Sequence, residues 1–362
     1  MIKKAMKAVW GVATLVLLLV VVGCAGRMEQ SETVGQTGVE DTQNTLGSLQ
    51  IAEEGDYGSV SLNGTDYELT QPVKSYLFIG TDLSGNEEAV GEEYQGSMAD
   101  VLMVIVVNEE EKTYGILQLN RDTITKVPLL LKDGTANASA KLQLCTAHWY
   151  GADKEASCEN TVVTVEKMLG GIKIDGYYAL QMAGISMLNQ AIGGVTMTFD
   201  ADFTEVDPAM KQGATLTLTD EQAEKLIRAR YEMTDDRNTL RMERQRAFLN
   251  AFMKQVQEKN AENPDFIIQL YDRLHPFSTE NLNMNELSRL LKNTKEYRFT
   301  GLFTIEGESK IGQRLHDGLD HWEFIMDTNS LEQVMKDLYP LSEVAAPDEE
   351  ETEEYPIEEE EE

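Results

Sequence analysis

The sequence predicts an α/β or α+β domain, because buried-strand patterns come first, helical periodicity follows, and a further strand pattern comes late. Its 362 residues suffice for one large domain or two ordinary ones, and a hydrophobic content of 41% fits a globular protein. The formal net charge is −32, and residues 347–362 alone carry eleven of the acidic groups. This acidity argues against nucleic-acid binding, which needs clustered Lys and Arg.

The first element, residues 1–24, is typical of an export signal. Three lysines precede the apolar run Leu15–Val22, and the run ends at Gly23-Cys24. A small residue before cysteine resembles a bacterial lipoprotein cleavage box, in which Cys24 becomes the lipidated first residue. The alternative is an uncleaved signal anchor with Cys24 incidental, since the apolar stretch is near the minimum for a membrane span. Both interpretations place the rest of the chain outside the cytoplasm and tethered to the membrane.

Next come a polar segment and a hairpin. Residues 25–50 are rich in Glu, Gln, Thr, Ser and Gly, which predicts a flexible spacer. Within residues 51–72, two alternating runs flank Asn63-Gly64, a strong hairpin signal and the basis of a predicted N-terminal extension. The main domain is expected over residues 73–345, and the acidic segment 346–362 is expected to be disordered.

The main domain begins with strands and continues with helices. Apolar runs predict strands, and a 3.6-residue period predicts helices. Thr219 and Gln222 form a capping box at the start of one helix. The expected strands are Tyr76–Ile79, Val101–Val107, Tyr114–Leu119 and Tyr297–Thr304. The expected helices are Thr161–Leu169, Ala179–Ile192, Asp220–Arg230 and Leu240–Glu258.

Charged residues gather where the first three strands begin or end. Asp82 follows the first strand, Asp100 precedes the second, and Arg121-Asp122 follows the third. If the second and third strands form an antiparallel hairpin and the first ends at the same edge, these side chains meet. Three carboxylates and an arginine can bind a hard divalent cation and a phosphate. The alternative is ordinary solvated charge at strand ends.

A second cluster is made of arginines: six of the chain's twelve lie within nineteen residues. Arginine contacts phosphate through two N–H groups and stays charged when partly buried. Arg241 and Gln245 are four residues apart and share a helix face. The cluster predicts phosphate recognition, with a salt-bridged surface helix as the alternative. Its members are Arg228, Arg230, Arg237, Arg241, Arg244 and Arg246.

The histidines and cysteines give weaker signals. Without an HExxH, GxSxG or P-loop pattern, Ser-His-Asp hydrolysis has little support, and His148 is expected to be a packed or hydrogen-bonded side chain. Cys145 and Cys158 are spaced to close a small disulfide loop in an oxidising exterior or to stay reduced in an anaerobic habitat. The sequence leaves both states open.

Seven short motifs in a fixed order, over residues 74–256, resemble those of the LytR-CpsA-Psr family. The versions at Ser157–Thr161 and Asn238–Met242 look like those of clostridial Gram-positive bacteria. The seven motifs are Tyr76–Asp82, Ala99–Val104, Leu119–Thr123, Ala147–Gly151, Gly193–Val195, Arg228–Arg230 and Arg241–Gln245.

The resemblance implies an α/β/α sandwich with a central mixed sheet and an apolar interior that accepts a lipid tail. It implies an extracytoplasmic, membrane-tethered enzyme that moves a glycopolymer, such as teichoic acid or capsule, from a polyprenyl-diphosphate carrier onto peptidoglycan with a divalent cation, usually Mg²⁺. Asp82 and Asp100 match the metal-binding aspartates, and Asp100 or Asp122 is the candidate base for the acceptor hydroxyl. The residues that match pyrophosphate-binding positions are Arg121, Arg228, Arg230, Arg241 and the neighbouring Gln245.

The chain departs from the family pattern at several positions. Met98 stands where the family commonly has arginine, Asn120 replaces a proline, and Asn238 stands where aspartate is frequent. The metal-and-phosphate scheme survives these changes. An alternative hypothesis is a non-catalytic polyprenyl-phosphate- or glycan-binding envelope lipoprotein of the same fold, for which Met98 is the best support. Turnover of a polyprenyl-diphosphate glycan separates the two hypotheses.

Overall fold

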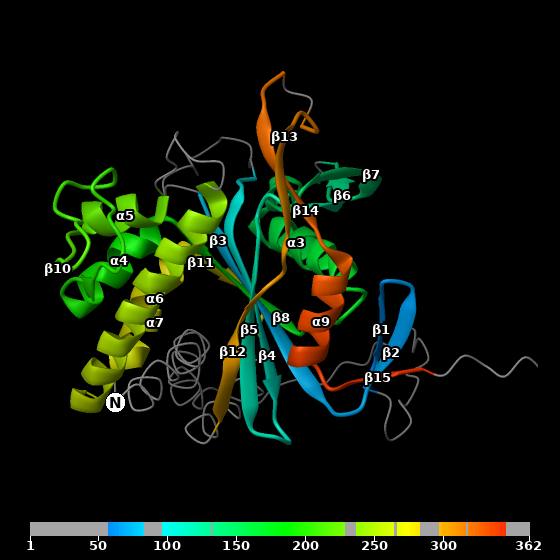
Figure 1. The fold of residues 1–362 in the computed structure, drawn as a ribbon, viewed down its shortest axis with the longest axis horizontal. Helices are drawn as coiled ribbons and strands as arrows, with labels where there is room; N and C mark the ends of the chain where they lie inside the picture. The colour runs from blue at the N-terminus through cyan, green and yellow to red at the C-terminus, as the bar shows by residue number, and fades with distance from the viewer. Residues whose placement is uncertain are drawn as a thin grey trace, which may run out of the picture.

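A mixed six-stranded sheet forms the centre of the computed structural model, which describes residues 57–82, 96–131, 133–228, 237–263, 266–282, 297–315 and 318–344 (Figure 1). The strand order is β11-β8-β3-β4-β5-β12. Strands β3, β4 and β5 are mutually antiparallel neighbours, whereas β8 pairs with β3, and β12 with β5, in parallel. The strands are β3 (Val73–Thr81), β4 (Ala99–Asn108), β5 (Thr113–Leu119), β8 (Gly176–Gln181), β11 (Ser278–Glu280) and β12 (Arg298–Thr304).

Helices cover both faces of this sheet, which confirms the predicted sandwich. In Figure 1, α4 to α7 lie on one side of the sheet and α3 with α9 on the other. The side chains of β4 alternate between two apolar cores: Met103 and Ile105 face α4–α7, and Leu102 and Val104 face α3 and α9. Burial on both faces explains why this strand is an unbroken apolar run. The helices are α3 (Lys154–Met168), α4 (Ala183–Ile192), α5 (Asp220–Arg228), α6 (Arg237–Glu262), α7 (Phe266–Leu274) and α9 (Thr328–Leu338).

Smaller ribbons surround the sandwich. The predicted hairpin forms β1 and β2, and its turn uses positive φ angles at Asn63 and Gly64. Strand β15, which comes late in the chain, pairs with β2. Its inward side chains belong to the core under α3 and α9. The remaining short elements are β1 (Ser59–Leu62), β2 (Thr65–Leu69), β6 (Ile124–Leu130), β7 (Ala136–Gln143), η2 (Leu144–Trp149), β9 (Thr196–Thr198), β10 (Thr215–Thr217), η3 (His275–Phe277), β13 (Gly307–Gly312), β14 (His321–Met326) and β15 (Leu341–Glu343).

Local signals fix the helix ends. The capping box at α5 is confirmed: Gln222 N–H donates to Thr219 Oγ1 at 3.2 Å, and Thr219 N–H donates to Gln222 Oε1 at 3.1 Å. The helix predicted over Ala179–Ile192 was wrong at its start, because residues 176–181 form β8 and α4 begins only at Ala183. This segment joins the sheet in parallel beside β3, a long-range pairing that outweighs its local helical pattern.

Several predicted features lie outside the described residues: the export segment with Cys24, the spacer 25–50, Arg230 and the acidic segment 346–362. The backbone of Arg241 belongs to α6, but its side chain is likewise outside them. Within the part of the chain that the structure describes, no helix is both long and apolar enough to cross a membrane.

Candidate active site

The antiparallel arrangement of β3, β4 and β5 brings the first cluster together. Thr81 at the end of β3 lies opposite Ala99 at the start of β4, and Leu102 lies opposite Leu119 at the end of β5. The second and third strands therefore form the expected antiparallel pair, and the first strand ends on the same side. Asp82, Asp100 and the Arg121-Asp122 pair therefore lie together at one end of these three central strands, as predicted. We call this end of the strands the sheet edge.

Arg121 is the buried centre of this cluster, with only 6% of its surface exposed. Its Nη1 pairs with Asp100 Oδ1, and its Nε donates to Asp122 Oδ1 at 3.2 Å. Burial by itself lowers the pKa of Arg121, but the neighbouring Cys145, Asp122 and Asp82 outweigh burial, so the pKa is raised. The guanidinium is therefore a fixed positive charge at this edge.

Met98 links Arg121 to Asp82. The Nη2 of Arg121 donates to Met98 Sδ at 2.8 Å. The backbone N–H of Met98 donates to Asp82 Oδ1 at 3.0 Å, and its carbonyl accepts from Asp82 N–H at 3.2 Å. Met98, which stands where the resemblance leads one to expect an arginine, is thus in contact with both Arg121 and Asp82. Sequence reasoning missed this role, because a methionine gives no signal for it.

The loop after β5 is fixed by Asn120, which stands where the family often has proline. Its Oδ1 accepts the backbone N–H of Asp122 at 3.0 Å, and its carbonyl accepts the Thr123 hydroxyl at 2.6 Å. The carbonyl of Asp122 accepts Phe324 N–H of β14 at 2.8 Å. These bonds hold the Asp122 carboxylate beside Arg121.

The carboxylates of Asp82 and Asp100 can supply some, but not all, of the oxygen ligands that a hard cation needs. No group of three or more His, Cys, Asp or Glu side chains lies together as a metal site among the described residues. Mg²⁺, however, is commonly held by one or two carboxylates, with water and substrate phosphate completing its shell. The pair of aspartates fits that pattern, whereas a cation enclosed entirely by protein ligands does not fit.

The second cluster is arranged differently from the first. Arg228 is exposed, and its Nη1 pairs with Glu224 Oε1 at 2.7 Å, one turn back on α5. Arg244 is buried, and its Nε donates to the Leu226 carbonyl at 3.1 Å. The amide of the buried Gln245 donates to the Ile227 carbonyl at 3.5 Å. Arg244 and Gln245 therefore join α6 to the end of α5. The phosphate-binding roles predicted for Arg228 and Gln245 stay predictions.

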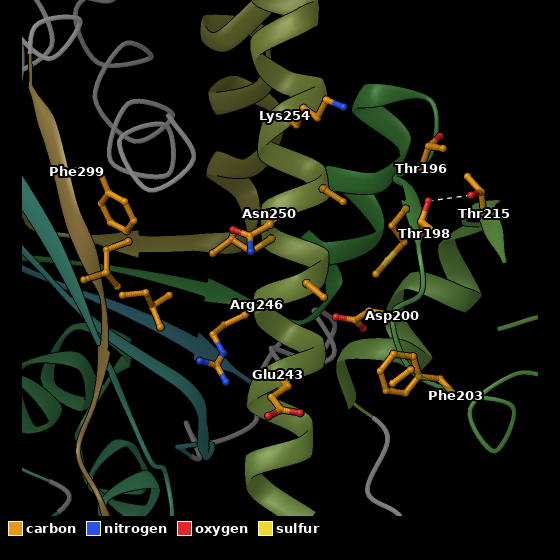
Figure 2. A pocket seen from close by; sticks show the side chains of 17 residues that line it. Thr196, Thr198, Asp200, Phe203, Thr215, Glu243, Arg246, Asn250, Lys254 and Phe299 are labelled. Atoms are coloured by element: carbon orange, nitrogen blue, oxygen red, sulfur yellow. Dashed lines mark hydrogen bonds between the residues drawn. The ribbon is translucent and has the colours of Figure 1, made fainter. Parts of the chain in front are cut away.

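A cavity of about 1130 Å³ lies along α6 (Figure 2). Figure 2 shows that Phe299 lies on one side of α6 and Asp200 and Phe203 on the other. Asp200 and three residues of α6 (Glu243, Arg246 and Lys254) supply charge to a lining that mixes polar and apolar side chains. Sequence reasoning counted Arg246 in the cluster but gave it no site. The apolar lining residues are Ile116, Met197, Ala201, Phe203, Ala247, Leu249, Ala251, Phe299 and Leu302.

His148 is 2% exposed and confirmed as a hydrogen-bonded core residue. Its Nδ1 lies 3.1 Å from the Ser97 carbonyl, which only accepts, so Nδ1 carries the proton. Its Nε2 lies 3.6 Å from Cys158 Sγ and accepts the thiol hydrogen. Burial lowers the pKa of His148 to about 4 and, with nearby acidic groups, raises that of Cys158. Cys145 and Cys158 are both buried and are not joined in a disulfide in the structure.

The chain belongs to the LytR_cpsA_psr family, whose model matches residues 36–339. Biofilm regulatory protein A of Streptococcus mutans is 30% identical over 208 residues, which are 56% of this chain and 48% of that protein. The polyisoprenyl-teichoic acid–peptidoglycan teichoic acid transferase TagU of Halalkalibacterium halodurans is 28% identical over 215 residues, which are 59% of this chain and 63% of that protein. The chain thus spans about half to under two thirds of these curated relatives.

A solved structure of Streptococcus agalactiae protein gbs0355 has the same fold. It superposes with a TM-score of 0.57 at 21% sequence identity, over 74% of this chain and 88% of that chain. The likeness confirms the α/β/α architecture.

Proposed function

We propose that this protein transfers a glycopolymer from a polyprenyl-diphosphate carrier onto peptidoglycan at the extracytoplasmic face of the membrane. The observation that carries the proposal is the buried Arg121 held by Asp100 and Asp122 at the sheet edge, with Asp82 beside them. Family membership and the similarity to a teichoic acid transferase support it. The export segment that ends at Cys24 supports a tether by a lipid or a signal anchor.

The cavity along α6 supports a lipid-linked donor. Its lining combines aliphatic and aromatic side chains from α6, β5 and β12 with charged groups of α6. An isoprenoid tail gains free energy by leaving water for such a lining, and its diphosphate needs a polar end. Arg246 and Glu243 bring charge of both signs to this lining (Figure 2).

The reaction is a phosphoryl transfer. A hydroxyl of peptidoglycan attacks the phosphorus that bears the glycan, and the bond from that phosphorus to the bridging oxygen breaks. The polyprenyl monophosphate leaves, and the hydroxyl proton passes to a carboxylate. Asp100 and Asp122 are the candidate bases, since each is beside Arg121 and only partly exposed. Arg121 stabilises negative charge that develops on the phosphate oxygens.

Asp82 and Asp100 would hold a divalent cation, and Mg²⁺ is the ion we expect. When bound, it supplies positive charge next to the phosphate oxygens and orients them. The chain's own contribution is to fix the two carboxylates: Asp82 through Met98 and Asp100 through Arg121.

The test is transfer of glycan from a synthetic polyprenyl diphosphate to peptidoglycan oligomers by the full chain. We expect Mg²⁺-stimulated transfer by the wild type and loss of the stimulation in Asp100→Asn, because the cation site loses an anionic oxygen ligand. Asp66→Asn, at an exposed position of β2, is the matched control and should behave as wild type. A folded wild type that binds the lipid but never turns it over would favour the binding-protein hypothesis.

A further inference from the structure

Met98 contacts the two parts of the site although its side chain has no charge. Its main chain exchanges two hydrogen bonds with Asp82, at 3.0 and 3.2 Å, and its Sδ lies 2.8 Å from Arg121 Nη2. Asp100 follows only two residues later in β4. Met98 is half-buried, and in this setting it lies between the carboxylate and the guanidinium rather than on a solvated loop.

With the Met98 contact, each of the three guanidinium nitrogens of Arg121 lies against a different residue. Its Nε donates a hydrogen bond to Asp122, its Nη2 donates one to Met98, and its Nη1 forms an ion pair with Asp100. A planar guanidinium fixed at three nitrogens keeps one orientation, and orientation decides whether arginine can contact phosphate through two N–H groups. A thioether is a weak, neutral acceptor, so it orients Nη2 without neutralising the positive charge as a third carboxylate would.

We propose that Met98 is a positioning residue for diphosphate binding. Its thioether holds the Nη2 of Arg121, and its main chain holds Asp82, so the guanidinium and the carboxylate keep a fixed relation. This inference rests on the proposed function, because it assumes that Arg121 and Asp82 face a diphosphate.

The test uses the full chain and inorganic pyrophosphate with Mg²⁺ as the probe, in titration calorimetry. Met98→Leu keeps the shape and the main-chain bonds but removes the acceptor, and we expect pyrophosphate affinity to fall about threefold to tenfold. Met98→Gln returns an acceptor oxygen at similar reach and should restore affinity to within about twofold of wild type. Met326→Leu, at another half-buried methionine, should leave affinity unchanged.

Equal affinity of wild type and Met98→Leu would overturn the proposal, and so would a Met98→Gln protein as weak as Met98→Leu. A second measurement does not depend on the ligand: the methyl signal of Met98 in a protein labelled with ¹³C at its methionine methyl groups should move in Arg121→Lys. An unmoved signal would also reject the contact. A wild type that binds no pyrophosphate, with a moved signal, would instead count against the proposed function and leave the contact established.

Discussion

The replacement Arg121→Lys tests whether the guanidinium geometry, rather than its charge alone, is needed. Arg121 makes separate contacts with Asp100, Asp122 and Met98 from three different nitrogens. A lysine ammonium is a compact charge at the end of a flexible chain and cannot reproduce all three. We count the loss of one charge-assisted hydrogen bond, about 1.5–3 kcal/mol. Because Arg121 is only 6% exposed, screening by water reduces this figure little.

The same loss should appear in two measurements. Transfer should slow by roughly one to two orders of magnitude, since about 1.4 kcal/mol corresponds to a factor of ten. The melting temperature, followed by circular dichroism, should fall by several degrees, because one of the two partly buried carboxylates that pair with the guanidinium loses its charge-assisted hydrogen bond. Arg273→Lys, at an exposed position of α7, is the control and should change neither quantity. A wild-type transfer rate in folded Arg121→Lys would refute the assigned role of the guanidinium.

Three further predictions concern the anchor, the tail and a buried histidine. Metabolic labelling with a fatty acid should mark the wild type but not Cys24→Ala; equal labelling would leave a signal anchor. Deleting Pro347–Glu362 should leave the melting temperature and turnover nearly unchanged, because eleven like charges in sixteen residues cannot form a core, and a large loss of either would show docking. The folded-state pKa of His148 is about 4 against an ordinary 6.5, so the unfolded chain binds the extra proton between these values. The free energy of unfolding should therefore fall by up to about 3 kcal/mol as the pH drops from 6.5 to 4. Denaturant unfolding measured at several pH values should show a smaller fall in His148→Gln than in the wild type.

The sequence predicted the sheet edge because strand geometry leaves few choices there. β4 contains a continuous apolar run, β5 is largely apolar, and a short connection joins them, so an antiparallel pairing follows and places Asp100 near Arg121. The hairpin of β1 and β2 was equally accessible, because Asn63-Gly64 supplies the two positive φ angles that a tight turn requires.

Other features depend on contacts between distant segments and have no local signal. The segment Gly176–Gln181 continues the apolar pattern of the following helix, and only its pairing with β3 makes it a strand. The ribbon β13–β14 depends on pairing between its two strands and on the hydrogen bond from Phe324 N–H to the Asp122 carbonyl, neither of which composition reveals. The thioether contact of Met98 depends on how the segment before β4 approaches the loop after β5. The density of arginines in the sequence predicted a cluster. It could not distinguish the buried Arg244, which donates to a backbone carbonyl, from the exposed Arg228, which pairs with a carboxylate.

The charges of the two clusters make them complementary. Asp82, Asp100 and Asp122 with Arg121 sum to −3 + 1 = −2, so the sheet edge by itself repels a diphosphate. Binding there requires positive charge from a cation on the aspartates or from the arginines that follow α5. The neutral Met98 sharpens this requirement, because an arginine at its position would have brought the sum to −1. The two sources differ in a measurable way: diphosphate binding that depends on the cation is lost on chelation, whereas binding carried by arginines persists and weakens with salt. Arg228 and Arg244 already have partners in Glu224 and the Leu226 carbonyl, and Arg246 lines the cavity along α6, whose lining contains none of the sheet-edge residues. We therefore expect the cation to be the larger contribution and chelation to abolish binding.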